Sequence, residues 1–368
     1  MQIICSACGE RYPLNTRKWV CRRCGGLFEI ADTPRFDPAR IETSNATLWR
    51  YRAFLPLPDD AVPVSMGEGF TPLVETALGD GTFLSKMDFM MPSGSFKDRG
   101  TTILASALKG FGFQKVVEDS SGNAAASLAA YAARAGLQAE IFVPAHASPA
   151  KLAQIQVYGA QVRKIEGPRE NAANAVQAAA RQGEAYYASH YYNPFALAGM
   201  KTTAWEIWEQ LGRRAPGAVI APVGHGTNLL GLARGFQELR AAGWITAMPR
   251  LYAAQSEKVA PLVAAFERGL EEVPATEPAL TVAEGIAINR PVHGKELVRA
   301  LRESGGAAIS VSEAEILQAR NDLARAGLYV EPTSATAVAA LHRLRARAHV
   351  EGETVVTLTG SGLKAAES

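Results

Sequence analysis

The chain of 368 residues has no large charge of either sign and no long hydrophobic run. Its 38 basic and 36 acidic residues give a net charge of +2, which offers no broad attraction to nucleic acid or to a membrane surface. The first residues lack the apolar core of a signal peptide, and no apolar stretch approaches the length of a membrane span. We therefore expect a cytoplasmic protein with no nucleic-acid and no membrane partner.

Cysteine is absent beyond residue 24, and the four cysteines before it, Cys5, Cys8, Cys21 and Cys24, form two C-x2-C pairs. Each pair is followed by a glycine, and together the pairs supply four thiolates for a tetrahedral metal ion. Disulfides are the alternative, and a reducing cytosol argues against them. We predict a Zn²⁺ ribbon. Because all four positions are used, this zinc is predicted to be structural and not catalytic.

The ribbon also carries basic and aromatic side chains, which leaves nucleic-acid binding as an alternative role for it. The rest of the chain has no matching basic excess, so we do not favour that alternative. The residues in question are Arg11, Tyr12, Arg17, Lys18, Trp19, Arg22 and Arg23.

A proline-rich connection follows the ribbon, and from about residue 82 short β-type runs alternate with alanine-rich helical stretches. Gly136 and Gly327 follow two of these helices, as C-terminal capping glycines do. The alternation predicts an α/β fold with a mostly parallel sheet, whose ligand lies beyond the carboxyl ends of the strands. The predicted strands are 83–86, 115–118, 140–143, 161–165, 218–222, 250–253, 307–311 and 354–358, and the predicted helices include 123–135, 195–211, 229–242, 312–326 and 333–347.

Lys97 lies in the segment 92–100, which follows the first predicted strand and opens a helix. A lysine that forms an imine must lose its proton near neutral pH, and burial or a helix N-terminus favours that loss. A solvated residue of the first helical turn is the alternative for such a lysine on its own.

Three further loops stand between a strand and a helix or at the end of the last strand. Residues 224–228 combine glycines with a helix start, which suits an anion, although a tight turn is the alternative. Residues 120–123 precede another helix, where Asn123 is either a ligand-binding side chain or an N-cap. Residues 357–364 end the last strand, where a plain β-turn is the alternative.

Taken in this order, the four loops resemble those of the tryptophan-synthase-β-like family of pyridoxal-phosphate (PLP) enzymes, fold type II. The run Gly94-Ser95-Phe96-Lys97-Asp98-Arg99-Gly100 is similar to the family's Schiff-base motif, and Thr359-Gly360-Ser361-Gly362-Leu363-Lys364 is similar to the terminal motif of its threonine-synthase subgroup. The resemblance begins at Gly67, and the cysteine ribbon resembles that of archaeal-type members.

The resemblance implies two doubly wound α/β domains with the cofactor cleft between them, plus the N-terminal zinc ribbon. Residues 1–31 would form the ribbon, 32–100 and 200–368 the large PLP-binding domain, and 101–199 the small domain. Lys97 would hold PLP as a Schiff base and act as the catalytic base. Cofactor binding would also use Asn123, Gly224, His225, Gly226, Thr227, Asn228 and Thr359, and substrate binding would use Ser120, Ser121, Gly122, Lys86 and Glu284.

The chain departs from the threonine-synthase pattern in its expected phosphate-binding positions. Ala196 stands where the subgroup has an arginine, and His190 and His225 replace smaller polar residues. Lys86 and the two histidines are candidates to compensate, and polar residues at a pocket rim are the alternative for the histidines. Glu284, in Ala283-Glu284-Gly285, resembles a dehydratase segment instead, with a surface acid as the alternative.

The resemblance therefore implies a PLP-dependent lyase that acts on a small amino acid. Threonine synthase, which converts O-phosphohomoserine and water to threonine and phosphate, is the leading prediction. A threonine or serine dehydratase and a β-replacing cysteate-synthase-like enzyme are the alternatives. Relatives are commonly homodimers, and we expect one here.

Overall fold

The computed structural model describes residues 1–58, 60–79, 81–147, 149–183, 185–347, 350 and 352–364. The chain forms two compact units. The first unit contains Met1–Glu68 and Lys97–Gly199, and the second contains residues 69–96 and 200–364. Within the described part of the chain, no helix is both long and apolar enough to cross a membrane.

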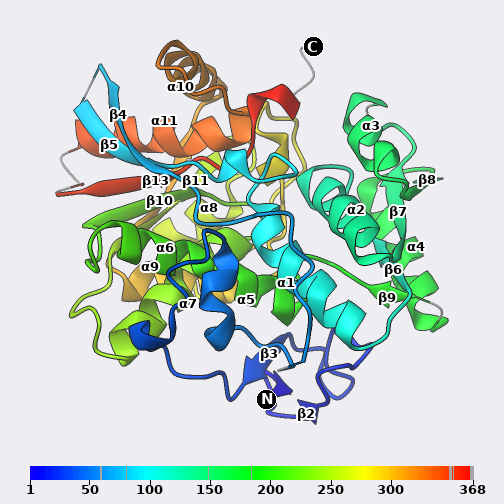
Figure 1. The fold of residues 1–368 in the computed structure, drawn as a ribbon. Coiled ribbons are helices and arrows are strands. Elements are labelled where there is room, and N and C mark those ends of the chain that lie inside the picture. The colour runs from blue at the N-terminus through cyan, green and yellow to red at the C-terminus, as the bar shows by residue number, and fades with distance from the viewer. Residues whose placement is uncertain are drawn as a thin grey trace. The chain divides into compact units, whose positions relative to one another are not determined.

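The first unit begins with a small antiparallel sheet in the order β2-β1-β3. β1 (Gln2–Cys5) lies between β2 (Arg11–Tyr12) and β3 (Phe28–Ala31), as the blue strands near the N-terminus in Figure 1 show. Trp19, between the two cysteine pairs, packs edge-on against Tyr187 with 5.3 Å between ring centroids. The ribbon is therefore anchored on the α/β part of the same unit.

The α/β part of the first unit is a parallel sheet in the order β8-β7-β6-β9. Its central strand β7 buries a continuous apolar run, as a strand covered on both faces does. α2 and α4 flank this sheet on opposite sides in Figure 1. The elements are α1 (Lys97–Gly110), β6 (Lys115–Glu118), α2 (Asn123–Ala135), β7 (Gln138–Pro144), α3 (Pro149–Val157), β8 (Gln161–Ile165), α4 (Arg169–Arg181), β9 (Tyr186–Tyr187) and α5 (Pro194–Met200).

The second unit is built on a six-stranded sheet in the order β12-β11-β10-β13-β5-β4. All neighbouring strands are parallel except β4 and β5, an antiparallel pair at one edge. The strands are β4 (Leu73–Leu78), β5 (Gly81–Lys86), β10 (Ala218–Pro222), β11 (Arg250–Ser256), β12 (Ala307–Val311) and β13 (Thr354–Thr357).

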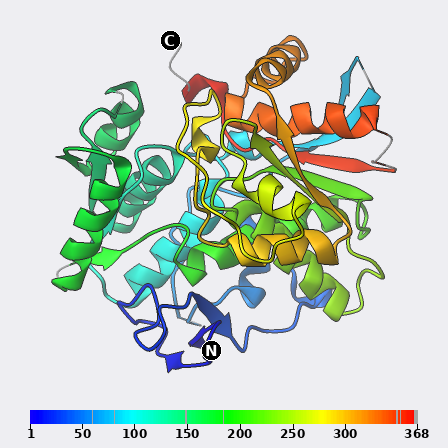
Figure 2. The same cartoon turned by 180° about the vertical axis from the view of Figure 1, so that it is seen from behind.

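Helices cover both faces of this sheet. α11 runs along one face, and α7 and α9 lie against the other, where Figure 2 shows α8 and α9 from behind. Alanines and small apolar residues of α11 pack on β10, β11 and β13, which lets the helix approach the strands closely. The helices are α6 (Thr202–Gln210), α7 (Thr227–Ala241), α8 (Pro261–Glu267), α9 (Gly294–Glu303), α10 (Glu313–Arg325) and α11 (Pro332–Ala346).

The predicted α/β class and all eight predicted strands are confirmed. Gly136 (φ 78°) and Gly327 (φ 86°) both adopt the left-handed conformation that helix ends favour. The single helix predicted over 195–211 is wrong, because α5 and α6 meet at Lys201. Just before this junction, a Cβ on Gly199 would lie 2.0 Å from the Arg99 carbonyl oxygen, so close packing of the backbone constrains the chain there.

The compact units divide the chain at different positions from the predicted domains. Residues 32–68 and 97–100 lie in the first unit, whereas the prediction grouped them with the larger domain. The ribbon, predicted as a separate part, also belongs to the first unit. The domain division drawn from the family resemblance thus stays a prediction.

Candidate functional site

The four cysteine sulfurs lie within 4.8 Å of one another. The Cys5 and Cys24 sulfurs are 3.5 Å apart and those of Cys8 and Cys21 3.7 Å apart, well beyond the about 2.05 Å of a disulfide. A Cβ on Gly26 would approach the Cys5 sulfur to 2.7 Å, so the close turn needs glycine there. This arrangement of four thiols can hold a metal ion.

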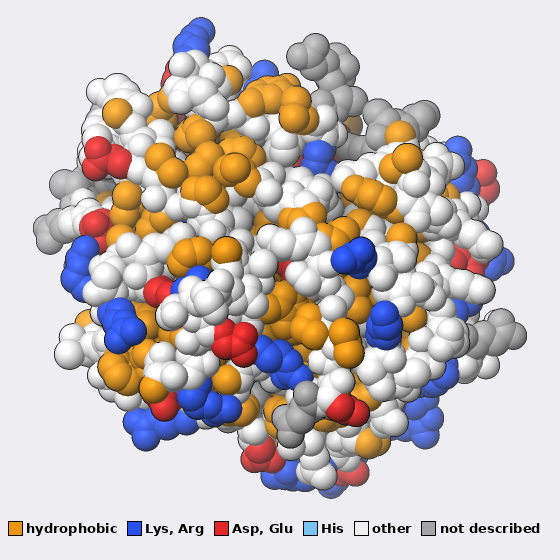
Figure 3. Space-filling model, in the orientation of Figure 1, with side chains coloured by type: hydrophobic (Ala, Val, Ile, Leu, Met, Phe, Trp, Pro, Cys, Tyr) orange, Lys and Arg blue, Asp and Glu red, His pale blue; other side chains and the backbone are white. Residues whose placement is uncertain are grey.

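Two arginines of the ribbon, Arg17 and Arg23, contact neighbours within the first unit. Arg17 donates to the Gly183 carbonyl oxygen at 2.8 Å and lies over the Phe113 ring. Arg23 pairs with Glu10 at 3.6 Å. On the face in Figure 3, basic side chains are interspersed with acidic and uncharged ones. This arrangement gives no support to the nucleic-acid alternative.

The predicted lysine motif and the predicted terminal motif meet in the second unit. The Phe96 amide donates to the Thr359 carbonyl oxygen at 2.9 Å, and the Ser361 amide donates to the Gly94 carbonyl oxygen at 3.0 Å. Gly94 has a φ of 80°, which favours glycine at this close approach. Lys97 is the next residue of the chain after Phe96, and α1 begins at Lys97, as predicted.

Ser334, which no sequence motif indicated, holds the end of β13. Its hydroxyl oxygen accepts the amides of Thr359 and Gly360 at 2.9 and 2.7 Å and lies 3.0 Å from the Thr359 hydroxyl. Thr333, beside it, accepts the Gly285 amide at 3.1 Å. The start of α11 therefore positions both the terminal motif and the segment of Glu284. Pro332 at the first helical turn was the only local signal.

The glycine loop leads into α7 as predicted. Gly226 is the N-cap with a φ of 87°, no side chain caps the helix, and its first turn holds no acidic residue. The backbone amides at this helix start therefore remain available to an anion, whose charge the helix dipole favours. A Cβ on Gly224 would approach the Ile286 backbone to 3.1 Å, so the predicted Glu284 segment lies against this loop, with Glu284 itself exposed.

Asn228 contributes a second sign of a ligand to this loop. Its Nδ2 lies 3.3 Å from the Thr357 hydroxyl, while its buried Oδ1 has no hydrogen-bond partner among the described residues. An unsatisfied buried polar atom is costly, so a ligand at this place would offset the cost. The Asn228 oxygen is an acceptor and would pair with a donor of the ligand, whereas the backbone amides of 224–228 fit the PLP phosphate and the Thr359 hydroxyl fits its ring.

The Ser120–Asn123 loop lies in the first unit, where β6 ends and α2 begins. Gly122 is the N-cap, and Asn123 is the first helical residue, so the N-cap alternative for Asn123 is wrong. The Ser120 hydroxyl accepts the Gly122 amide at 3.2 Å, which shapes the turn. Lys97 belongs to the same unit, whereas Gly224–Asn228 and Thr359 belong to the second.

A buried polar cluster lies at the end of β6, just before this loop, and joins the predicted His190 to two carboxyl groups, Glu118 and Asp119, that no sequence motif indicated. Glu118 Oε1 lies 2.8 Å from His190 Nδ1. Asp119 accepts the Tyr187 hydroxyl at 2.7 Å and the Tyr191 hydroxyl at 3.3 Å. Burial, and then the negative charge of Asp119, raise the pKa of Glu118 to about 8. The pairing of Glu118 and His190 joins residues 72 positions apart, which no local pattern indicates.

Lys86, a predicted substrate residue, lies fully buried in the second unit. Its ammonium lies 2.7 Å from Glu206 Oε2 and donates to the Thr71 carbonyl oxygen at 2.7 Å and to Gln210 Oε1 at 2.8 Å. Because an ammonium has three protons, these acceptors account for all of them. A role for Lys86 in substrate binding stays a prediction. It requires the ammonium to replace at least one of these acceptors with the substrate.

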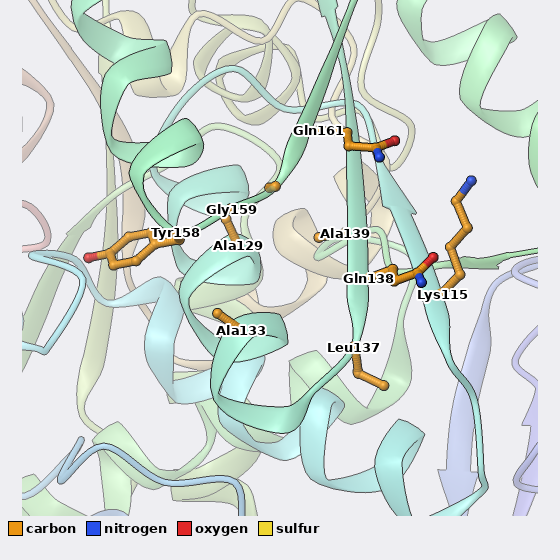
Figure 4. Close-up of a pocket in the computed structure, with 10 residues that line it drawn as sticks. Lys115, Ala129, Ala133, Leu137, Gln138, Ala139, Tyr158, Gly159 and Gln161 are labelled. Carbon is orange, nitrogen blue, oxygen red and sulfur yellow. The ribbon is translucent and has the colours of Figure 1, made fainter.

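Ala196 lies in α5 and is buried, 1% exposed. Asn193 begins this helix by accepting the Phe195 amide at 2.9 Å, so the local backbone is tightly set. A pocket of about 200 Å³ in the first unit, drawn in Figure 4, lies elsewhere. Lys115, Tyr158 and the start of β7 line this pocket, and none of the predicted site residues does.

Comparison with known proteins agrees with the motifs. The family model of "Pyridoxal-phosphate dependent enzyme" matches residues 64–360. The threonine synthase of Methanocaldococcus jannaschii is 34% identical over 98% of this chain and 92% of its own length. The threonine synthase of Methanosarcina acetivorans is also 34% identical, over 96% of this chain and 90% of its own length.

Solved structures show the same fold. The threonine deaminase of T.th. superposes with a TM-score of 0.70 at 28% identity, covering 81% of this chain and 94% of its own. The serine racemase of Dictyostelium discoideum has a TM-score of 0.68 at 23% identity, covering 79% of this chain and 92% of its own, and supports the fold alone. From the motifs, the glycine loop and these matches, it follows that the chain belongs to the family of pyridoxal-phosphate dependent enzymes.

Proposed function

We propose that the protein is a PLP-dependent lyase of the threonine-synthase type, which converts O-phosphohomoserine and water to threonine and phosphate. The observation that carries the proposal is the 34% identity to a threonine synthase over 98% of the chain, a span that includes the cysteine ribbon as well as the PLP-enzyme region. PLP supplies an electron sink that eases the loss of protons from carbon and the departure of the leaving group.

The residues of this chain divide the work. Lys97 would hold PLP through a Schiff base, and its amine would also carry protons to and from carbon. The amides of Gly224–Asn228 at the start of α7 would bind the PLP phosphate, and Thr359 would offer its hydroxyl to the ring nitrogen. Asn123 would hydrogen-bond the ring, and Ser120–Gly122 would bind the substrate carboxylate.

The buried Ala196 and the engaged Lys86 leave fewer cations for a substrate phosphate than the threonine-synthase pattern requires. A dehydratase needs no such cations, since hydroxide leaves. The similarity of the fold to a threonine deaminase structure at 28% identity, together with Glu284, therefore makes threonine dehydration the second candidate.

The experiment that separates the candidates supplies holoenzyme with O-phosphohomoserine, threonine and O-phosphoserine in separate reactions. Release of phosphate together with threonine from the first substrate supports the proposal. Ammonia and 2-oxobutyrate from threonine would support the dehydratase, and no phosphate from O-phosphohomoserine would refute the leading proposal.

The Lys97→Ala variant tests whether Lys97 holds the cofactor. We expect loss of the visible absorbance of bound cofactor and at least about a 1000-fold fall in turnover, because the same amine holds PLP and moves protons. Lys109→Ala is the matched control: this exposed lysine lies at the other end of α1 and should change neither readout.

We further propose that the ion held by the cysteines is Zn²⁺, because four thiolates with tetrahedral spacing favour it. Metal analysis of the purified protein tests this identity, and a ribbon without zinc would contradict it. The homodimer and the cytoplasmic location stay predictions from the sequence.

A further inference from the structure

Glu118 is the last residue of β6, two residues before the loop proposed to bind the substrate carboxylate, and His190, which follows β9, lies beside it. The His190 Nδ1 and Glu118 Oε1 atoms are 2.8 Å apart, and the two side chains are 13% and 1% exposed. The other Glu118 oxygen, Oε2, is buried and has no hydrogen-bond partner among the described residues. Such a carboxyl group is not explained by packing, since a buried oxygen left unsatisfied destabilises the fold.

We infer that Glu118 and His190 form a proton-exchanging pair for the amino-acid substrate, in which Glu118 orients the imidazole and His190 exchanges a proton through Nε2. The inference deepens the proposed function and rests on it. A carboxyl group bonded to Nδ1 fixes the orientation of the ring and the site of its proton, so that a proton exchanged with a substrate passes through Nε2.

The charges around the pair favour an extra proton at neutral pH. Burial is the main cause that raises the pKa of Glu118 to about 8, and the negative charge of Asp119 adds to it. Lys97, at the start of α1, and Arg169, at the start of α4, lower that pKa, as does the His190 backbone. Below about pH 8 the pair therefore holds one extra proton, compared with an ionised Glu118 beside a neutral His190. With that extra proton bound, Nε2 carries a hydrogen.

The neighbours of the pair keep it in place. Tyr191 packs edge-on against the His190 ring, with 5.0 Å between the centroids. Burial raises the pKa of both Tyr187, well above its usual range, and Tyr191, so their hydroxyls stay protonated and donate to Asp119. Asp119 thus stays fixed beside Glu118, and its charge acts on the pair at a constant distance.

The proposed proton transfer balances over one turnover. When the C–O bond to the phosphate breaks, its electron pair leaves with the phosphate oxygen, and the His190 Nε2 proton moves to that oxygen. When water adds, an electron pair of the water oxygen forms the new C–O bond, and a water proton returns to Nε2. Lys97 handles the protons on carbon, so His190 begins and ends the cycle in the same state.

The first test follows the histidine ring nitrogens of holoenzyme by NMR between about pH 6 and 9, with His190 assigned from its missing signal in His190→Gln. We expect the pair to lose its extra proton near pH 8, and the His190 ring to show no such step in Glu118→Gln, because the carboxyl group that binds the proton is gone. His342→Gln, in α11, is the matched control for assignment. Unchanged titration of His190 in Glu118→Gln would overturn the inference whatever the substrate is.

The second test measures kcat and KM across the same pH range with the amino acid that the wild-type enzyme consumes. We expect Glu118→Gln to lower kcat at least about 10-fold and His190→Gln at least about 100-fold, with KM within about 3-fold. The basic limb of the kcat profile should move in Glu118→Gln. Glu140→Gln, on the adjacent strand β7, is the matched control and should leave the profile unchanged.

The two tests distinguish the failure of this inference from that of the proposed function. If O-phosphohomoserine is not consumed but the titration and the kcat profile with another amino acid respond as expected, the pair stands and the substrate assignment fails. If O-phosphohomoserine is consumed and neither variant lowers kcat, the substrate assignment stands and the proton-exchanging role is refuted.

Discussion

Two glutamates of the first unit, Glu68 and Glu118, are equally buried but differ in what surrounds their oxygens. Each is 0–1% exposed. Each of the two Glu68 oxygens accepts two hydrogen bonds. In Glu118, Oε1 lies beside the His190 imidazole, and Oε2 has no hydrogen-bond partner among the described residues. The donors to Glu68 are Trp49 Nε1 (2.7 Å), the Thr102 hydroxyl (2.7 Å), the Met66 amide (2.7 Å) and the Tyr131 hydroxyl (2.8 Å).

The number of hydrogen-bond donors around a buried carboxyl group distinguishes a structural group from a reactive one. Four donors compensate Glu68 for its lost hydration, and they tie the start of the region that resembles the family to η2 (Leu48–Phe54), α1 and α2. Glu118 lacks that compensation, so its pKa is raised, and a raised pKa is typical of functional sites. Three predictions test this contrast.

The largest effect is expected from Glu68→Leu. The substitution leaves two buried side-chain donors, those of Trp49 and Tyr131, without their acceptor, while the Thr102 hydroxyl keeps the Val64 carbonyl oxygen at 2.8 Å. We expect a loss of about 4 kcal/mol in the free energy of unfolding, comparable to breaking a buried charge network. Urea unfolding followed by circular dichroism measures it. A loss below about 1 kcal/mol in the free energy of unfolding would contradict a structural role for the Glu68 carboxyl group.

A smaller effect, opposite in sign, is expected from Glu118→Gln at alkaline pH. The folded pKa of Glu118, about 8, lies above its ordinary value of 4.5, so the folded state binds the proton more tightly than the unfolded chain. Its contribution to stability is therefore complete below pH 4.5 and is lost as pH rises to about 8.

We expect wild-type protein to lose about 3 kcal/mol of unfolding free energy from this group between about pH 5 and 8, and the glutamine variant to lose less. Glu140→Gln, which removes a partly exposed ion pair with Lys115, is the control and should retain the wild-type slope. Parallel slopes in wild type and Glu118→Gln would refute the raised pKa.

The smallest effect concerns single donors. Tyr131→Phe removes one of the four bonds to Glu68, and we expect a loss of about 1.5 kcal/mol in unfolding free energy. Tyr187→Phe removes one of two bonds to Asp119 and should cost about 1 kcal/mol, while also changing the pH profile of turnover because Asp119 acts on Glu118. If Tyr131→Phe changed the pH profile and Tyr187→Phe did not, the assignment of roles to the two carboxyl groups would be reversed.

Much of the fold could be predicted because its signals are local. The strand at 218–222 and the helix at 123–135 were predicted to the residue, since each is bounded by its own glycine or turn. One helix was predicted over 195–211, whereas the structure has two, and the close approach of Gly199 to the backbone of Arg99, a hundred positions earlier, is a constraint that no local pattern shows.

The candidate site divides in the same way. Lys97, the glycine loop at 224–228 and the cysteine pairs were recognisable from the sequence, because each is a short motif whose spacing carries its chemistry. Ser334 and Glu118 were not, because their significance depends on partners 25 and 72 positions away.

The sequence alone therefore determined the α/β class, the family resemblance and the lysine proposed to anchor the cofactor. Only the tertiary structure decided which buried carboxyl group is compensated and which is not. Burial and the number of donors set the free energy of a charge inside a protein, and both depend on how distant segments pack. For that reason Glu68 and Glu118, which are the same residue type, are proposed to differ in function.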